Sequence, residues 1–179
     1  MTERSMFAGF GGQGIISLGQ IWVYCAMAEG KNVTFFPFYG AEKRGGVARA
    51  SVVVSGEAIS SPLVTRADSV LVMNNESMAV SENLLKKGGL MLVYASLVSK
   101  RPARADIRVV ELPFTGTAES LGDTRVANMV ALGALAKLTG ALALDGVKAI
   151  LEKFFPPAKH RFIPLNVAAI EAGQKLAMA

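Results

Sequence analysis

The chain has 179 residues, of which 51% are hydrophobic and 18% are charged, and this composition excludes an intrinsically disordered protein. Its single cysteine, Cys25, excludes an internal disulfide and an iron–sulfur cluster ligated by cysteines of this chain alone, so a reducing, cytoplasmic location is expected. The net charge of +5 raises the question of nucleic-acid binding, but the basic residues are scattered, and we expect no nucleic-acid partner.

The first half of the chain alternates strand and helix patterns. An apolar run that ends at glycine, residues 5–10, predicts a buried strand, and residues 15–29 carry apolar side chains at helical spacing. The segment 75–89 predicts a second helix, because acids lie early, two lysines lie late and Gly88 follows as a cap. Further strands are predicted at residues 31–39 (ending near Pro37), 47–56, 69–74, 90–95 and 107–113.

The last third of the chain is predicted to be helical. A short helix covers residues 115–122, and a longer one covers residues 124–139 and is closed by Gly140. Asp145 is expected to cap a third helix, which runs to residue 155 and is stopped by two prolines, and a final helix covers residues 164–178. The strand and helix order predicts an α/β fold with a mainly parallel sheet and a helical C-terminal third, and we expect one domain, residues 1–179.

Two apolar stretches bear on membrane insertion. Residues 15–28 are too few to span a bilayer. Residues 126–144 are longer but contain Asn128, Lys137 and Gly140, so they predict a buried helix and a turn. The N-terminal segment does not have the form of a signal peptide, and we therefore expect no membrane association.

The most informative stretch is FAGFGGQGIIS, residues 7–17, in which Gly9, Gly11 and Gly14 have the G-x-G-x-x-G spacing. Glycine permits a positive φ and a close approach of ligand to backbone, and the helix that follows offers free N–H groups to an anion. A dinucleotide site also needs an acid about 20 residues further on, and none occurs before Glu42. An anion site, a dinucleotide site and a purely structural turn therefore stay open.

A second charged stretch, residues 38–50, contains Tyr39, Glu42, Lys43, Arg44 and Arg49 around three glycines. It follows a strand beside the glycine turn, where open α/β sheets bind ligands, although a solvated loop explains it equally well.

Residues for independent catalysis are scarce. The only histidine, His160, lies between Lys159 and Arg161, where an exposed loop is the simpler interpretation, and a solvated loop is also expected for the basic segment 100–108. Cys25 lies on an apolar helix face and is expected in the core. No metal-ligand spacing is present, so we expect neither a metal site nor a catalytic residue in this chain.

Four motifs occur in the order expected of the gamma subunit of 2-oxoacid:ferredoxin oxidoreductases, in the pyruvate/2-oxoglutarate ferredoxin oxidoreductase family. They are GFGGQGIISLGQIW (9–22), YGAEKRGGVARASVVVS (39–55), PLVTRADSVLVMN (62–74) and LGDTRVANMVALGALAKLTG (121–140), and a final set of Asn166, Ala169 and Gly173 also fits. The chain resembles this family over nearly its whole length. The resemblance implies a three-layer, Rossmann-like α/β domain.

The resemblance also implies a function. Such complexes oxidatively decarboxylate a 2-oxoacid to an acyl-CoA and reduce ferredoxin, and overall likeness favours 2-oxoglutarate. Thiamine diphosphate and the iron–sulfur clusters would reside in partner subunits (alpha, beta and in some complexes delta), with ferredoxin reached through the complex. The gamma part would help to bind coenzyme A and to close the active site. The implied cofactor-binding residues are Gly9, Gly11, Gly12, Gln13, Gly14, Tyr39, Gly40, Glu42, Arg44, Gly45 and Gly46.

Three other expectations stay beside this one. The chain could be a stand-alone oxidoreductase that binds NAD(P) or a flavin through its glycine turn, or a purely scaffolding subunit whose loops contact only protein. When isolated, it could also pair as a homodimer through an apolar face meant for partners.

Overall fold

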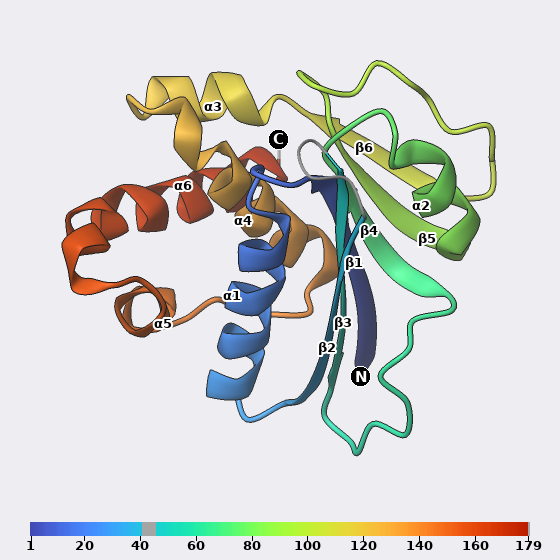
Figure 1. Cartoon of the computed structure of the whole chain (residues 1–179), viewed down its shortest axis with the longest axis horizontal. Coiled ribbons are helices and arrows are strands. Elements are labelled where there is room, and N and C mark those ends of the chain that lie inside the picture. Colours follow the sequence, from blue (N-terminus) through green and yellow to red (C-terminus); the bar gives the residue numbers. More distant parts are fainter. Residues whose placement is uncertain (41–45, 179) are drawn as a thin grey trace. The chain divides into compact units, whose positions relative to one another are not determined.

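The computed structural model describes residues 1–40 and 46–178, and the chain divides into two compact units, residues 1–112 and 113–179. The N-terminal unit is an α/β layer structure and the C-terminal unit is helical (Figure 1). The α/β fold class with a mainly parallel sheet and a helical last third is therefore confirmed.

A six-stranded sheet in the order β2-β3-β1-β4-β5-β6 organises the N-terminal unit. β1 lies beside β4, β4 beside β5 and β5 beside β6 in parallel, whereas β3 runs antiparallel to both β1 and β2. Five strands thus share one direction and β3 opposes them. The strands are β1 (Thr2–Phe10), β2 (Asn32–Tyr39), β3 (Val47–Ser55), β4 (Ala67–Val72), β5 (Leu85–Tyr94) and β6 (Arg108–Leu112).

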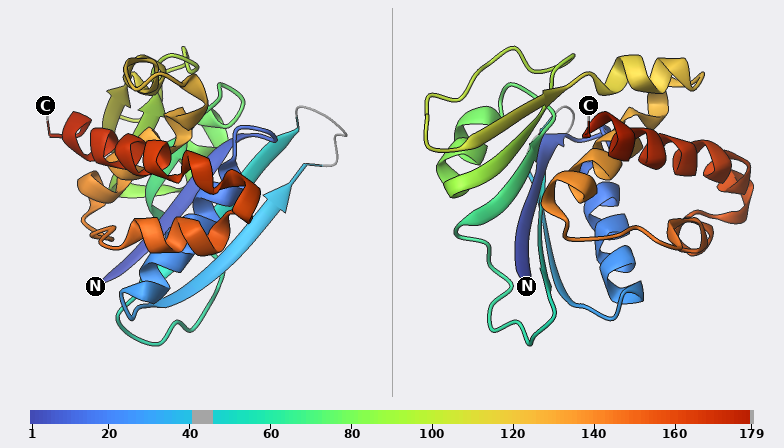
Figure 2. Two further views of the ribbon diagram at one scale, coloured as in Figure 1. Left: turned by 90° about the vertical axis from the view of Figure 1, so that its left-hand side faces the viewer. Right: turned by 180° about the vertical axis from the view of Figure 1, so that it is seen from behind.

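Two helices flank this sheet on opposite sides, which makes three layers (Figures 1 and 2). Helix α1 (Ile15–Ala28) packs on β1, β2 and β3, and its Trp22 ring meets the ring of Phe7 edge to face at 5.8 Å. Gly19 allows this close packing, because a methyl group there would lie 2.8 Å from the ring of Phe35. Helix α2 (Met78–Leu84) packs on β4 and β5.

The helix predicted at residues 75–89 was too long. Helix α2 ends at Leu84 and β5 begins at the next residue, Leu85, which pairs with Ala67 of β4. The lysines that looked like helix C-terminal charges belong to the strand, and Lys86 forms an ion pair with Asp68 of the neighbouring β4. Gly88 does have a positive φ of 72°, but within β5 and not as a helix cap.

The C-terminal unit contains helices α3 (Phe114–Ser120), α4 (Ala127–Thr139), α5 (Val147–Phe154) and α6 (Ile163–Leu176), with 3₁₀ helices at Thr124–Val126 and Pro157–Phe162. Helices α4 and α6 cross at two glycines. A methyl group at Gly133 would overlap the carbonyl of Ile170, and one at Gly173 would overlap the carbonyl of Val130. The absence of side chains at these two positions therefore allows the two helix backbones to touch.

The ends of these helices agree with the sequence prediction at one position and differ at another. Gly140 ends α4 in the left-handed conformation with φ 63°, as predicted. Asp145 does not cap α5: the helix begins one residue later than expected, behind Gly146, whose φ is 74°, and no side chain caps it. No helix in the described part of the chain has the length and apolar character to cross a membrane.

Candidate functional site

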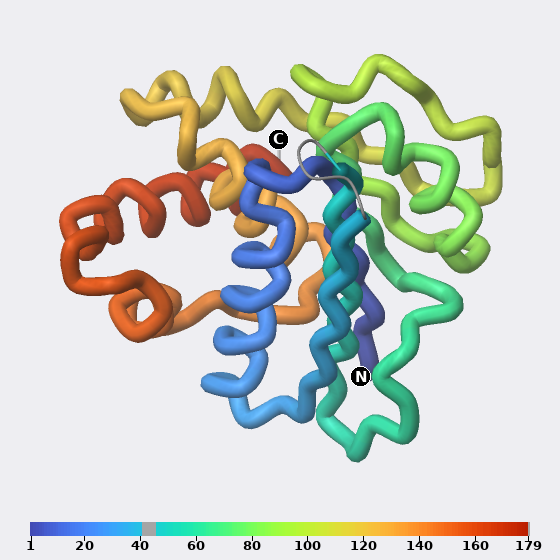
Figure 3. Tube along the Cα trace, in the orientation of Figure 1, coloured from blue at the N-terminus to red at the C-terminus, as the bar shows by residue number. Residues whose placement is uncertain are grey.

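The glycine turn lies between the end of β1 and the start of α1, where Figure 3 traces the chain from sheet to helix. Gly12 and Gly14 have φ of 99° and 80°, which a residue with a side chain adopts only with strain. The hydrogen-bond ladder of α1 begins with the bond from the Leu18 N–H to the Gly14 carbonyl. The amides of the first helical turn, Ile15 to Ser17, precede this ladder, so the positive end of the helix dipole faces outward from the turn.

Gln13 closes this turn with both ends of its side-chain amide. Its Oε1 accepts a hydrogen bond from the Phe10 N–H at 2.7 Å, and its Nε2 donates one to the Met73 carbonyl at 3.0 Å. The side chain therefore joins the carboxyl ends of β1 and β4. Gly9 provides the space, because a methyl group there would lie 2.5 Å from Gln13 Oε1 and 2.8 Å from Ile15 Cδ1.

The second predicted stretch meets the glycine turn directly. The Gly11 N–H donates a hydrogen bond to the Gly46 carbonyl at 3.0 Å, and the Gly40 N–H donates one to the Val47 carbonyl at 2.9 Å. The structure thus brings together Gly9, Gly11, Gly12, Gln13, Gly14, Tyr39, Gly40 and Gly46. The other predicted residues, Glu42, Arg44 and Gly45, and also Lys43, lie outside the described residues.

These two segments border one open hollow of about 240 Å³, which we call the glycine-turn hollow. Gly11, Gly12 and Gly14 line it, and Tyr39, 64% exposed, lies at its border. Its lining includes Ile15, Ile16, Ser17 and Ala48, which the sequence analysis did not select. Their only sequence signal is position, directly after the turn or opposite Tyr39 in the β2–β3 ladder.

Arg49 does not share this hollow. Residues alternate between the two faces of a strand, and Ala50 of β3 faces α1, because a methyl group added to Gly19 of that helix would lie 2.9 Å from its Cβ. Arg49 therefore faces the opposite side of the sheet, where it stacks on Phe38. Arg49, which the sequence places in the charged stretch beside the glycine turn, is thus separated from the turn by the sheet.

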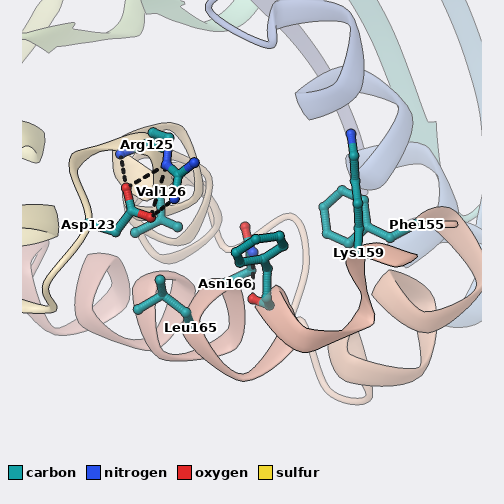
Figure 4. A pocket seen from close by; sticks show the side chains of 8 residues that line it. Asp123, Arg125, Val126, Phe155, Lys159, Leu165 and Asn166 are labelled. Carbon is teal, nitrogen blue, oxygen red and sulfur yellow. Dashed lines mark hydrogen bonds and ion pairs between the residues drawn. The ribbon is translucent and has the colours of Figure 1, made fainter. Parts of the chain in front are cut away.

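A separate hollow of about 200 Å³ lies within the C-terminal unit (Figure 4). Val126, Phe155, Phe162 and Leu165 supply its apolar lining. Its charged members are Asp123, Arg125 and Lys159, and Asn166 also lines it.

The charges at this second hollow are partly paired within the chain. Arg125 donates from Nη2 to Asp123 Oδ2 at 2.6 Å, and the hydrogen bonds from its side chain and its backbone N–H lower the pKa of Asp123 to about 2. The neighbouring His160 lies in a 3₁₀ helix and not in an open loop, with its Nε2 2.9 Å from the Phe155 carbonyl oxygen. This second hollow was not anticipated from the sequence, because it depends on how two distant segments pack.

The described residues offer no cluster of three or more histidine, cysteine or acidic side chains that could hold a metal. Cys25 is buried in the core as predicted, and burial raises the pKa of its thiol to about 12, which keeps it protonated and unreactive. The glycine-turn hollow is bordered by three glycines and by the first turn of α1, whose free backbone N–H groups are suited to binding an anion.

Comparisons with known proteins show which family the chain resembles. The family described as pyruvate ferredoxin/flavodoxin oxidoreductase matches residues 4–176. The "Ketoisovalerate oxidoreductase subunit VorA" of Methanothermobacter thermautotrophicus is 35% identical over 97% of this chain, which spans only 36% of that protein. The "2-oxoglutarate synthase subunit KorC" of Methanothermobacter marburgensis is 33% identical over 99% of this chain and 98% of its own length. The chain thus spans about a third of one relative and nearly all of another.

Solved structures show the same fold. The gamma subunit of a keto/oxoacid ferredoxin oxidoreductase from Geobacter sulfurreducens has a TM-score of 0.85 and 30% identity, over 99% of this chain and 97% of that one. A 2-oxoglutarate:ferredoxin oxidoreductase from Magnetococcus marinus, with 2-oxoglutarate, coenzyme A and succinyl-CoA bound, has a TM-score of 0.86 and 28% identity, over 99% of this chain and 31% of that one. The glycine turn, the sheet that carries it and nearly the full length of the sequence are thus those of one family, and the chain belongs to the pyruvate ferredoxin/flavodoxin oxidoreductase family.

Proposed function

We propose that this chain is the gamma subunit of a 2-oxoacid:ferredoxin oxidoreductase, which oxidatively decarboxylates a 2-oxoacid to an acyl-CoA and passes the electrons to ferredoxin. Relatives of matching length support this assignment, among them a KorC subunit and a gamma subunit of known structure. Thiamine diphosphate and the iron–sulfur clusters would then be held by alpha, beta or delta partners, since this chain has one cysteine and one histidine in all. We infer 2-oxoglutarate as its substrate.

We further propose that the glycine-turn hollow receives an anionic part of coenzyme A. The observation that carries this proposal is the meeting of two segments at one hollow, fixed by the bond from the Gly11 N–H to the Gly46 carbonyl. Amides at the start of α1 and the positive end of its dipole suit the diphosphate of coenzyme A. The chain would bind and orient this group and help to close the site, while the chemistry proceeds on the partner subunits.

The order of the strands in the sheet argues against a dinucleotide site. In dinucleotide-binding folds the strand next to the first one runs parallel to it, and an acid at its end binds the ribose. Here β3 lies between β1 and β2 and runs antiparallel to β1. The neighbouring strand therefore starts, and does not end, beside the glycine turn, so no ribose-binding acid can come from its carboxyl end.

A charge placed in the hollow tests the coenzyme A proposal. Ser17→Asp adds a carboxylate to the first turn of α1, where the helix dipole stabilises it, so folding and assembly should be unaffected. In the assembled complex we expect the KM for coenzyme A to rise about tenfold through charge repulsion. Ser60→Asp, on an exposed segment, is the matched control and should leave this KM unchanged.

The assay is acyl-CoA formation from 2-oxoglutarate, pyruvate and 3-methyl-2-oxobutanoate, with the chain co-expressed with its partner subunits. An equal KM for coenzyme A in both aspartate variants would remove the assigned site. Calorimetry of coenzyme A on the assembled complex then separates a binding role from pure scaffolding. Absence of acyl-CoA formation by the unmodified complex with all three acids would overturn the subunit assignment itself.

A further inference from the structure

The outer part of the sheet carries a third hollow that the proposed function does not use. It lies on the sheet face away from α1, has a volume of about 250 Å³, and is lined by Met6, Phe36, Phe38, Leu63 and Arg49 among others. We call this feature the β2 hollow. β2 is the edge strand of the sheet, with no further strand beside it in the described structure (Figure 2, left).

Three of the apolar side chains that line the β2 hollow are open to solvent. Phe36 is 48% exposed, Phe38 is 44% exposed and Leu63 is 58% exposed. Large apolar side chains gathered at one place on a surface mark sites of interaction with other molecules. Aromatic residues and arginine are also enriched in the buried core of protein interfaces.

Arg49 adds a charged hydrogen-bond donor to this apolar surface. It is paired with Phe38 across the β2–β3 ladder, and its Cζ lies 4.5 Å from the centroid of the Phe38 ring. Its Nε is buried without a hydrogen-bond partner, and no carboxylate of the described residues forms an ion pair with it. A buried guanidinium donor without an acceptor is destabilising, and a planar guanidinium held on an aromatic ring is arranged to bind a carboxylate through two hydrogen bonds.

The relatives of this chain are named as subunits of oxidoreductases. The match to this chain makes up 36% of the related VorA subunit and 31% of the Magnetococcus chain. In these relatives the same fold is continuous with additional polypeptide. The proposed function makes this chain one subunit of such an enzyme, so its partners are other subunits of the oxidoreductase.

We propose that the β2 hollow docks a segment of another subunit of the oxidoreductase, in which an Asp or Glu carboxylate pairs with Arg49 and a neighbouring apolar side chain fills the space between Phe36, Phe38 and Leu63. This inference rests on the proposed function, because it requires a multisubunit complex. It assigns a partner surface on the sheet face opposite the glycine-turn hollow.

The test measures binding of the purified full chain to the purified thiamine diphosphate-bearing subunits by calorimetry. Arg49→Met keeps the stem of the side chain and removes its donors, and we expect it to raise the dissociation constant about 30-fold or more. Arg49→Lys keeps the charge but not the planar fork and should raise it about tenfold. Arg108→Met, at the opposite edge of the sheet on β6, is the matched control and should bind within twofold of the unmodified chain.

A stability measurement separates docking from a structural role. Arg49→Met removes a buried donor that has no acceptor among the described residues, so its urea midpoint should equal or exceed that of the unmodified chain. A lower midpoint together with weaker binding would make Arg49 a structural residue and overturn the proposal. Equal binding of Arg49→Met and Arg108→Met would also overturn it.

Two further measurements detect other occupants of the β2 hollow. If sedimentation shows a dimer of the isolated chain that Arg49→Met dissociates, the β2 hollow binds a second copy and the proposal is overturned. Saturable binding of 4-methylpentanoate to the isolated chain, lost in Arg49→Met while subunit binding persists, would make it a small-molecule site and overturn it equally. Failure of the unmodified chain to bind any thiamine diphosphate-bearing subunit would refute the proposed function, which is a different result.

Discussion

Gln13→Ala should destabilise the N-terminal unit by about 2–3 kcal/mol, although this side chain lies in a surface turn. The substitution removes the hydrogen bonds with the Phe10 N–H and the Met73 carbonyl and leaves both backbone groups without these partners. Each loss costs about 1–1.5 kcal/mol for a partly buried group. The measurement is urea unfolding followed by fluorescence of Trp22, the only tryptophan, which lies in the helix that follows the turn.

Gln20→Ala, in the same helix, is the matched control and should change the free energy of unfolding by less than about 0.5 kcal/mol. Gly9→Ala should also destabilise the unit, because its methyl group would displace Gln13. The double variant should then lose less than the sum of the two single losses, since both disrupt one arrangement. A loss below about 0.5 kcal/mol for Gln13→Ala, or additive losses, would refute this account of the turn.

Three further predictions concern buried positions. Burial raises the pKa of Glu3, so the folded chain keeps a proton that the unfolded chain loses above about pH 4.5. The free energy of unfolding of the unmodified chain should therefore fall relative to that of Glu3→Gln as the pH rises, which urea titrations at several pH values measure. A difference between the two free energies that does not change with pH would contradict this. Gly173→Ala should lower the free energy of unfolding by about 2–3 kcal/mol, as measured by thermal unfolding, because its methyl group would overlap the backbone of α4. The control Gly116→Ala has open space around it and should not lower this free energy. Equal unfolding midpoints for the two variants would contradict the close helix crossing. The Cys25 thiol should resist Ellman's reagent in the folded chain and react in urea; rapid reaction when folded would contradict its burial.

Local chemistry explains which parts of the fold could be predicted. The start of α1 and the end of α4 at Gly140 depend on glycine conformations that neighbouring residues reveal, and both were predicted correctly. The helix expected at 75–89 was wrong in its second half, because acid and lysine placement imitates a helix dipole. What decides this segment is the pairing of Leu85 with Ala67 and of Lys86 with Asp68, and pairing between strands is not visible in a local pattern.

The candidate site was predictable in part for the same reason. The glycines of the turn are recognisable by spacing, and their meeting with the segment that ends at Gly46 agrees with the expectation that two turns are neighbours. The sequence could not show that the side-chain amide of Gln13 is hydrogen-bonded to backbone groups of the chain itself. It also could not show that Arg49 faces the other side of the sheet. The first depends on β4 lying beside β1, and the second depends on the insertion of β3 between β1 and β2; no residue pattern indicates either arrangement.

The reversed direction of β3 has a consequence for how this scaffold can diversify. Since β3 begins where β1 ends, two backbone bonds anchor the strand ends beside the glycine turn, one from Gly40 to Val47 and one from Gly11 to Gly46. Bonds between backbone groups do not depend on the identity of the side chains beside them. An exposed position such as Tyr39 can therefore be substituted to reshape the border of the glycine-turn hollow while the strands keep their register.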